Sequence, residues 1–391
     1  MLTEKSVKIR DEYCSRCIIC SSVCPFEAIY LNREAGEVIL DIEKCQVCGI
    51  CFSACPSSSI DIAYYKVALL SKYVEKMRKN NLLLMCRGAI IKPELKESLK
   101  KNGVLDDSAQ LHVPCVGRIP PEFLLKTIEA GVKKILIVPC EDDKCRFKVG
   151  SDINVSRLVL LQKLLSQIGL DYNALSFVRS SIKAYINKYR CIGCGNCAYT
   201  CPNRAIKIVS PGVAQLNEAA CSGCGACVSV CPSLAINLEG FENNLILETI
   251  SKYRPLISEV KIRSGSPVVA VFYCHWANFP APDEYRAHIK ESIVFFEIPC
   301  SSMISPLYIL QAFYEGFDGV LVVACKKGEC KFERGNELAE RHIVALKNLL
   351  RQVNLENRLE ICFVSPKYLG EIDNQIKLFM DRIASLIEGS R

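Results

Sequence analysis

Two stretches of the chain alternate short apolar runs with amphipathic segments, a pattern typical of successive β–α units on a parallel sheet. The first stretch predicts strands at 82–85, 111–113, 135–138 and 175–178, with helices that include 121–130 and 155–167. The second predicts strands at 268–273, 293–297, 320–324 and 359–364, with helices that include 306–314 and 336–352. We therefore expect two small α/β domains of the doubly wound type, flavodoxin-like or Rossmann-like.

A cysteine-rich segment precedes each of these stretches, and each segment holds two runs of the form C-x2-C-x2-C-x3-C-P. The four runs are Cys14, Cys17, Cys20 and Cys24; Cys45, Cys48, Cys51 and Cys55; Cys191, Cys194, Cys197 and Cys201; and Cys221, Cys224, Cys227 and Cys231. In such a run three closely spaced thiolates bind one 4Fe-4S cube, and the fourth cysteine reaches the cluster of the other run. The spacing therefore predicts two interlocked pairs of 4Fe-4S clusters.

This exchange of the fourth cysteine gives four predicted ligand sets. They are Cys14, Cys17, Cys20 and Cys55; Cys45, Cys48, Cys51 and Cys24; Cys191, Cys194, Cys197 and Cys231; and Cys221, Cys224, Cys227 and Cys201. Structural zinc favours paired C-x2-C knuckles that close on four ligands, so triplets with a prolyl fourth cysteine argue against it.

The remaining cysteines show that the whole pattern occurs twice. Each α/β stretch carries four: Cys86, Cys115, Cys140 and Cys145 in the first, and Cys274, Cys300, Cys325 and Cys330 in the second. The second and third members are 25 residues apart in both sets, and each set ends in C-x4-C. A tandem duplication is expected. The predicted domains are two ferredoxin-like modules at 1–66 and 183–245, and two α/β domains at 67–182 and 246–391.

The α/β cysteines have a predictable location. Three of each set directly follow the first three predicted strands, and open α/β sheets bind ligands beyond the carboxyl ends of their strands. We expect four thiols to converge at this edge in each domain. Four thiolates hold either a 2Fe-2S cluster or zinc. Next to ferredoxin-like modules the cluster is favoured, which gives one or two 2Fe-2S clusters in the chain.

Two resemblances follow from these motifs. Residues 7–65 and 184–240 resemble bacterial two-cluster ferredoxins, which are small α+β modules that relay electrons. The segments VVAVFYCHW, IPCSSMISP and DGVLVVACKKGECKFERGN are similar to the delta iron-sulfur subunit of methyl-viologen-reducing NiFe hydrogenases, over about residues 267–390. That resemblance implies a 2Fe-2S domain that passes electrons from a hydrogenase or formate dehydrogenase to heterodisulfide reductase. The ferredoxin-like segments also resemble parts of the large heterodisulfide reductase flavoprotein.

The chain departs from the delta-subunit pattern at named positions. The family commonly has C-x-W-C after the first strand, whereas Ala277 follows Cys274, His275 and Trp276 here. Lys331 stands where a histidine is expected, and the first α/β stretch, with Cys86-Arg87-Gly88-Ala89, diverges further. Details of the cluster environment are therefore not carried over.

Composition excludes several other functions. The formal charge of +7 counts every cysteine as neutral. Six clusters held by thiolates would add about −12 and make the protein acidic. Basic residues are dispersed, so no nucleic-acid partner is expected. The N-terminus has no apolar signal region and no stretch is long enough to span a bilayer, so we expect a cytoplasmic protein without a membrane span.

The expected function is electron transfer within an anaerobic oxidoreductase complex. The chain shows no flavin or dinucleotide motif and no constellation of catalytic residues, so partners would supply the substrate chemistry. These would be a heterodisulfide reductase-like flavoprotein and a donor of hydrogenase or formate dehydrogenase type. Two alternatives stay open. One is a thiol–disulfide oxidoreductase that uses the α/β cysteines. The other is a metal-dependent assembly scaffold in which the first copy serves only as a surface for binding partners.

Three positions carry narrower expectations. The first run, CSRCIIC, has Arg16, Ile18 and Ile19, whereas the runs CIGCGNC and CSGCGAC carry Gly193, Gly195, Gly223 and Gly225, so its cluster is expected to differ in reduction potential. His275 is expected to pack beside the cluster rather than bind it. Cys362, the one cysteine outside the repeat, is expected to be buried as a small hydrophobe.

Overall fold

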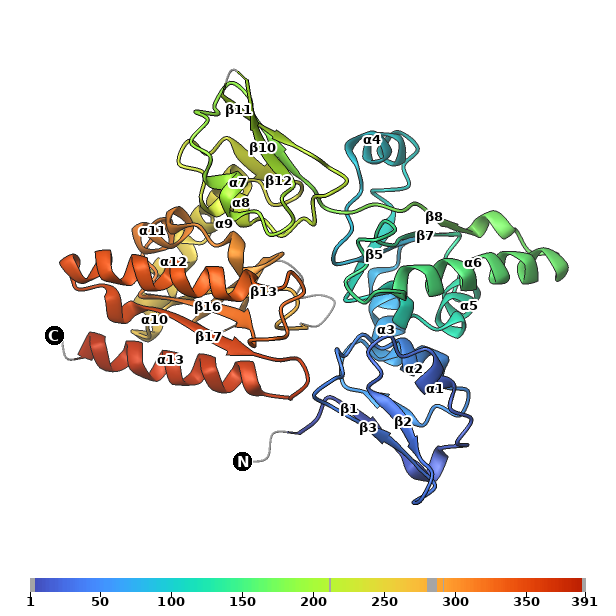
Figure 1. The fold of residues 1–391 in the computed structure, drawn as a ribbon. Helices are drawn as coiled ribbons and strands as arrows, with labels where there is room; N and C mark the ends of the chain where they lie inside the picture. The colour runs from blue at the N-terminus through green and yellow to red at the C-terminus, as the bar shows by residue number, and fades with distance from the viewer. Residues whose placement is uncertain (1–3, 211, 280–286, 291, 389–391) are drawn as a thin grey trace. The chain divides into compact units, whose positions relative to one another are not determined.

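The computed structural model describes residues 4–210, 212–279, 287–290 and 292–388. The ends of the predicted first and last domains, residues 1–3 and 389–391, lie outside the described residues. The chain forms two compact units, one made mainly of Met1–Ser181 and the other mainly of Ile182–Phe279, Glu284–Pro366 and Gly370–Arg391 (Figure 1). Each unit contains one cysteine-rich module followed by one α/β domain.

The cysteine-rich module of unit 1 is built from two antiparallel strand pairs and two short helices. Strand β1 pairs with β4, and β2 pairs with β3. The elements are β1 (Val7–Ile9), η1 (Asp11–Tyr13), α1 (Ile19–Ser22), β2 (Ile29–Asn32), β3 (Glu37–Leu40), α2 (Ile50–Ala54) and β4 (Ile60–Ile62). Both helices begin inside a cysteine run, so the runs form the turns that connect strands to helices.

The module of unit 2 has the same order of strands and α-helices. Strand β9 pairs with β12 and β10 pairs with β11, both antiparallel. The elements are β9 (Ala184–Ile186), α7 (Asn196–Thr200), β10 (Ile206–Val209), β11 (Val213–Leu216), α8 (Ala226–Ser229) and β12 (Ile236–Leu238). Each module is thus a small α+β fold, as expected for the two ferredoxin-like segments.

The α/β domain of unit 1 contains a parallel sheet with strand order β6-β5-β7-β8. Its elements are α3 (Val67–Met77), β5 (Asn81–Cys86), α4 (Pro93–Lys101), β6 (Ser108–Val113), η2 (Val116–Arg118), α5 (Pro121–Glu129), β7 (Lys134–Val138), α6 (Gly150–Gln167), η3 (Tyr172–Ala174) and β8 (Leu175–Phe177). This order matches the first four strands of the flavodoxin-like arrangement.

The α/β domain of unit 2 repeats this order as β15-β13-β16-β17 and adds β14 antiparallel to β15 at the edge. Its elements are α9 (Asn243–Ser251), α10 (Arg254–Ser264), β13 (Val269–Cys274), β14 (Ala287–Lys290), β15 (Ile293–Ile298), η5 (Ser301–Met303), α11 (Pro306–Glu315), β16 (Gly319–Cys325), α12 (Gly335–Leu350), η6 (Arg351–Val353), η7 (Glu356–Arg358), β17 (Leu359–Val364) and α13 (Glu371–Glu388).

Helices cover both faces of this second sheet. Val320 and Val322 of β16 belong to one buried core with Ile343 of α12, whereas Gly319 lies against Phe379 and Ile383 of α13. Neighbouring positions of a strand point to opposite faces. The predicted doubly wound arrangement therefore fits the layering of unit 2.

All eight predicted strands correspond to strands of the structure, within a few residues at their ends. The edge strand β14 was not predicted. Within the described part of the chain, no helix combines the length and the hydrophobicity that crossing a membrane requires.

Candidate metal centres

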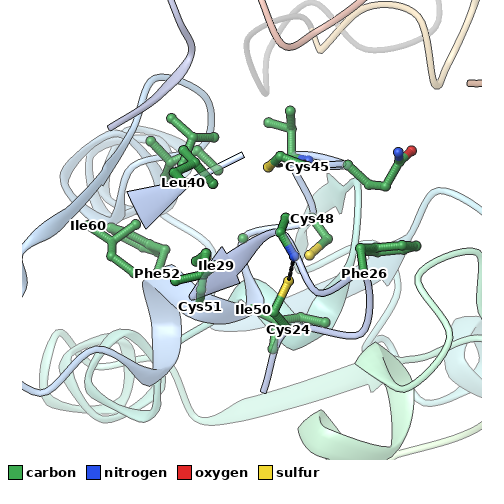
Figure 2. A pocket seen from close by; sticks show the side chains of 16 residues that line it. Cys24, Phe26, Ile29, Leu40, Cys45, Cys48, Ile50, Cys51, Phe52 and Ile60 are labelled. Atoms are coloured by element: carbon green, nitrogen blue, oxygen red, sulfur yellow. Dashed lines mark hydrogen bonds between the residues drawn. The ribbon is translucent and has the colours of Figure 1, made fainter. Parts of the chain in front are cut away.

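All 25 cysteines lie within the described residues, and none of them forms a disulfide. One predicted set surrounds an apolar pocket in the module of unit 1. The set consists of Cys24, Cys45, Cys48 and Cys51. Side chains including Phe26, Ile29, Leu40 and Phe52 complete the lining (Figure 2). Thus the fourth cysteine of the first run, Cys24, lies with the three leading cysteines of the second run.

The other predicted sets are also brought together. Burial, and then the charges of Cys55, Cys14 and Cys17, raise the pKa of Cys20. In unit 2, Cys191, Cys194, Cys197 and Cys231 line one pocket. Burial and the charges of Cys224, Cys221 and Cys201 raise the pKa of Cys227 well above the usual range. Each of the four groups expected from the run spacing is therefore a spatial neighbourhood in the structure.

Backbone N–H groups point at several of these sulfurs. Ala28 donates to Cys24 Sγ at 3.4 Å and Val47 to Cys45 Sγ at 3.4 Å. In unit 2, Ala205 donates to Cys201 Sγ at 3.3 Å. Such bonds stabilise thiolate over thiol and are one of the ways in which a protein adjusts an iron–sulfur centre.

The turns that wrap the sulfurs have left-handed backbone at two positions of every run, one before the second cysteine and one directly after it. Directly before the helix that carries the third cysteine, Gly49, Gly195 and Gly225 have φ of 82°, 82° and 77°. The first run places Ile18 there with φ 55°. A β-branched residue is costly in this conformation. The sequence difference noted in the first run is therefore a difference in backbone strain.

Arg16, the other unusual residue of that run, lies on the surface. Its guanidinium is 3.6 Å from a carboxylate oxygen of Asp11, and both side chains are more than half exposed. Water and Asp11 weaken its field, so the expected difference in potential for this cluster stays a prediction.

The α/β domain of unit 1 brings its four predicted cysteines into contact. Cys86 is the last residue of β5, and Cys115 and Cys140 come two residues after β6 and β7. The thiol of Cys86 interacts with those of Cys115 and Cys140, and Cys115 interacts with Cys145. The sulfurs thus form a continuous chain at the carboxyl edge of the sheet, where the topology predicted them.

Unit 2 has the same chain of sulfurs in the same order. Cys274 interacts with Cys300 and Cys325, and Cys300 interacts with Cys330. Cys274 Sγ and Cys325 Sγ are 3.8 Å apart. The sets in both domains are therefore equivalent in arrangement, although their flanking sequences differ.

These thiols are deeply buried. Cys86, Cys115, Cys274 and Cys300 are each 1% exposed. Burial, and then the interaction with Cys325, raise the pKa of Cys274 well above the usual thiol range, while the interaction with Cys300 opposes this. Removing anions from water is costly unless a cation compensates them. In each set the third thiol, Cys140 or Cys325, is also buried, whereas Cys145 and Cys330 are partly exposed. Such a set of four thiolates is chemically suited to a metal or a cluster, which supplies that positive charge.

Two glycines make room for these sulfurs. A β-carbon built on Gly150 would lie 2.3 Å from Cys115 Sγ, and one on Gly335 would lie 2.3 Å from Cys300 Sγ. Both glycines begin the helix that follows the C-x4-C loop. Their sequence spacing, five residues after Cys145 and Cys330, is the same in both domains, but nothing in the sequence alone indicates such a close approach.

The module and the α/β site are adjoining within each unit. In unit 1, Ser53 Oγ, two residues after Cys51, donates to the carbonyl oxygen of Gly117 at 2.8 Å. In unit 2, Ser302 Oγ donates to the carbonyl oxygen of Cys224 at 3.3 Å. In both cases the second cysteine run of the module meets the 3-10 helix that follows the second α/β cysteine. In each unit, this hydrogen bond therefore joins the segment that carries a module set to the segment that carries the α/β set.

Three further observations complete the site. Cys362 is buried in β17, as predicted. His275 is buried beside Cys274, and its Nδ1 lies 3.1 Å from Glu297 Oε1, which fits a packing role. Within the described residues, no three Cys, His, Asp or Glu side chains already surround a point where a single metal ion could bind.

Comparison with known proteins identifies the family. Residues 97–190 and 269–386, together more than half of the chain, match the family described as "Methyl-viologen-reducing hydrogenase, delta subunit". The chain belongs to this delta-subunit family. Residues 13–60 and 184–238 each match a 4Fe-4S dicluster domain. The delta-subunit and ferredoxin resemblances predicted from the motifs are confirmed, and the chain is an iron–sulfur electron-transfer protein.

Individual relatives cover different parts of the chain. It is 35% identical over 207 residues to one subunit of the ferredoxin:CoB-CoM heterodisulfide reductase of Methanosarcina mazei, which is 52% of this chain and 25% of that protein. It is 32% identical over 126 residues to an iron-sulfur subunit of the F420-non-reducing hydrogenase of Methanococcus maripaludis, 31% of this chain and 94% of that protein. The corresponding hydrogenase protein of Methanocaldococcus jannaschii is 33% identical over 124 residues, 31% of this chain and 92% of that protein. The chain thus spans only a quarter of the heterodisulfide reductase relative.

Proposed function

We propose that this protein is a cytoplasmic relay that carries electrons between a hydrogenase-type or formate dehydrogenase-type donor and a heterodisulfide reductase-like flavoprotein. The observation that carries the proposal is the contact, present in both units, between a four-cysteine set of the module and the four-cysteine set of the α/β domain. One buried cysteine set without such a neighbour would fit a structural site. Adjoining sets, repeated twice, fit a path for electrons.

The proposed relay holds four 4Fe-4S clusters on the module sets and a 2Fe-2S cluster on each α/β set, in a tandem duplication of one module and one α/β domain. Bound clusters supply one-electron storage and transfer. The chain's own residues hold them at fixed separation, exclude water from the inner sets and donate N–H groups to the sulfurs. No flavin site is part of this proposal.

The exposure of the cysteines suggests an order of sites within each unit. Cys17 and Cys194 are exposed, whereas the second-run and α/β cysteines are mainly buried. We infer that the first-run sets face a partner protein, that the second-run sets lie next, and that the α/β sets follow. The exposed aromatic side chains Tyr189 and Tyr199, each five residues from Cys194 in sequence, would provide part of an apolar contact for that partner.

The names of the relatives support the choice of partners. One part of the chain is similar to a component of a heterodisulfide reductase, and another part to an iron-sulfur component of a hydrogenase. A single chain that joins both kinds of segment is suited to connect a donor and an acceptor of these classes. Thiol–disulfide catalysis is disfavoured because a disulfide substrate would have to react at a pair in which one thiol, Cys140 or Cys325, is only 3% exposed, although its partner in the C-x4-C loop is partly exposed.

The decisive experiment is the metal content of anaerobically purified protein, with EPR spectra of the reduced sample at two temperatures. We expect about 20 irons with matching acid-labile sulfide per chain. About 16 to 18 irons, or stoichiometric zinc, would show that one or both α/β sets do not hold a cluster. Protein that carries no iron after anaerobic purification would overturn the relay itself.

A further inference from the structure

A buried arginine lies between the two adjoining sites of unit 1. Arg118 is the last residue of η2, three positions after Cys115, and it is 1% exposed. Its Nη2 donates to the carbonyl oxygen of Tyr64 at 2.7 Å, and its Cζ lies 5.4 Å from the centre of the Tyr65 ring. These contacts fix the side chain in one place.

The guanidinium lies directly against the second cysteine run of the module. A β-carbon built on Gly49 would be 3.1 Å from Arg118 Nε and 3.3 Å from its Cζ. Gly49 lies between Cys48 and Cys51, two members of one predicted ligand set. Burial lowers the pKa of Arg118 to about 10, while the charges of Tyr65, Cys48 and Cys115 oppose this. The side chain therefore stays positively charged at neutral pH.

Two of its nitrogens have no partner among the residues that the structure describes. Among the described residues, Arg118 Nε and Nη1 are buried and find no hydrogen-bond acceptor in the chain. An unpaired buried donor of this kind is costly. Donors beside Gly49 and Cys48 are placed where the sulfur atoms of a bound cluster would compensate them. The unpaired nitrogens of Arg118 are thus a second observation that points to a cluster, separate from the burial of the cysteines.

Unit 2 has an uncharged residue in the same place. Met303 is the last residue of η5, three positions after Cys300, and it is completely buried. A β-carbon built on Gly225 would be 2.8 Å from Met303 Cβ and 3.1 Å from its Sδ. Gly225 occupies the position of Gly49 within its run. The two junctions therefore have the same geometry and differ by one full charge.

The residue after the first α/β cysteine also differs between the two units. Arg87, directly after Cys86, is completely buried, and its Nη2 donates to the hydroxyl oxygen of Tyr65 at 3.1 Å. At the matching position of unit 2, His275 pairs with the carboxylate of Glu297. Unit 1 thus places a second buried arginine next to its α/β site, whereas unit 2 has a histidine–glutamate pair there.

We propose that Arg118 raises the midpoint potentials of the second-run and α/β centres of unit 1 above those of unit 2, which makes unit 1 the accepting end of the chain. This rests on the proposed relay function. One-electron reduction adds one negative charge without breaking a bond, and the electron comes from the donor protein. The guanidinium stabilises that charge, and it does so strongly because the surroundings are of low dielectric constant. Arg118 is thus a positioning and tuning residue.

The test uses the full chain with its clusters, titrated anaerobically and followed by EPR. Arg118→Met copies unit 2, Arg118→Lys keeps the charge, and Arg33→Met removes an exposed arginine of the same unit as a control. In Arg118→Met we expect the ratio of reduced to oxidised centre to fall at least tenfold for one component at fixed potential, about 59 mV for a one-electron couple. Arg118→Lys and Arg33→Met should keep the wild-type ratio.

The reciprocal change Met303→Arg tests the same idea in unit 2 and does not depend on how well Arg118→Met folds. It should raise the midpoint of one component. Wild-type iron and sulfide with unchanged midpoints in either Arg118→Met or Met303→Arg would overturn the proposed tuning and leave the relay intact. Absence of iron–sulfur signals in the wild-type protein would instead overturn the relay.

Discussion

The backbone of Gly335 lies so close to Cys300 that a β-carbon at this position would be 2.3 Å from the sulfur. The same approach relates Gly150 to Cys115 in unit 1. Contact at this distance is impossible without displacing either the sulfur or the start of helix α12. The α/β site of unit 2 therefore requires glycine, which has no side chain, at position 335.

Replacing Gly335 with alanine should disable the α/β site of unit 2 selectively. The added methyl group displaces Cys300, so we expect about two fewer irons per chain while the signals of the four 4Fe-4S clusters remain. Iron and sulfide analysis with EPR measures this. Gly328→Ala is the control for strain without steric contact, because Gly328 lies in the loop between Cys325 and Cys330, has open space for a β-carbon and has a left-handed φ of +82° that strains an alanine. Equal iron loss in both variants would contradict a steric role for Gly335.

The first cysteine run should gain stability when Ile18, one of its two left-handed positions, becomes glycine. Ile18 has φ 55°, whereas Ile19 begins helix α1, and their side chains are 45% and 41% exposed. Ile18→Gly and Ile19→Gly remove the same side chain and add the same flexibility to the unfolded chain. We therefore expect Ile18→Gly to be more stable than Ile19→Gly by about 1–2 kcal/mol, the cost of left-handed backbone for an L-residue.

Anaerobic denaturation followed by cluster absorbance compares these two variants. The denaturant concentration at which half of the absorbance is lost should be higher for Ile18→Gly than for Ile19→Gly. If Ile19→Gly equals or exceeds Ile18→Gly, the backbone of the first run is not strained at Ile18.

Much of this arrangement follows from the sequence. The apolar runs locate the strands, and parallel connectivity brings Cys86, Cys115 and Cys140 to one edge because all three follow strands of the same sheet. The C-x2-C spacing and the exchanged fourth cysteine likewise predict the neighbourhoods in the modules. These features depend on short-range periodicity and on topology, which the sequence carries directly.

Other features arise only from tertiary packing. Arginine side chains are usually exposed, so the sequence does not predict that Arg118 is buried. Its burial depends on how η2 packs against the module at Gly49. The close approach of Gly150 to Cys115 joins residues 35 positions apart in sequence through helix α6. Strand β14 is short and lies at an edge, where the hydrophobic pattern is weakest. No local signal distinguishes these positions from ordinary loop residues.

A buried hydrogen bond should couple the module and the α/β domain of unit 2. Tyr308 OH, on helix α11, donates to Asn243 Oδ1 at 2.7 Å, and Asn243 Nδ2 donates to the carbonyl oxygen of Ile236 in β12 at 2.9 Å. Tyr308→Phe removes the donor and leaves a buried acceptor unpaired. We expect a loss of about 1–2 kcal/mol in the free energy of unfolding.

Chemical denaturation of the two proteins, with the clusters followed separately from the helices, measures this loss. Tyr314→Phe on the same helix is the control, since Tyr314 is 73% exposed and its ring remains in place beside Arg254. A Tyr308→Phe variant as stable as Tyr314→Phe would show that the bond contributes nothing to joining the two parts.

Cys362 should distinguish the relay from thiol chemistry. It is the one cysteine outside the predicted ligand sets; burial, and then the charges of Glu360 and Glu371, raise its pKa to about 12. At pH 8 only about one in ten thousand molecules would carry this thiolate, which is the reactive form. We therefore expect iodoacetamide to leave the anaerobic holo protein unmodified at pH 8, and Cys362→Ala to keep the full iron content. Removing the iron with a chelator should then expose the ligand cysteines to the reagent. Modification of Cys274 or Cys300 in protein that retains all of its iron would instead show free thiols at the α/β site and favour a thiol–disulfide oxidoreductase.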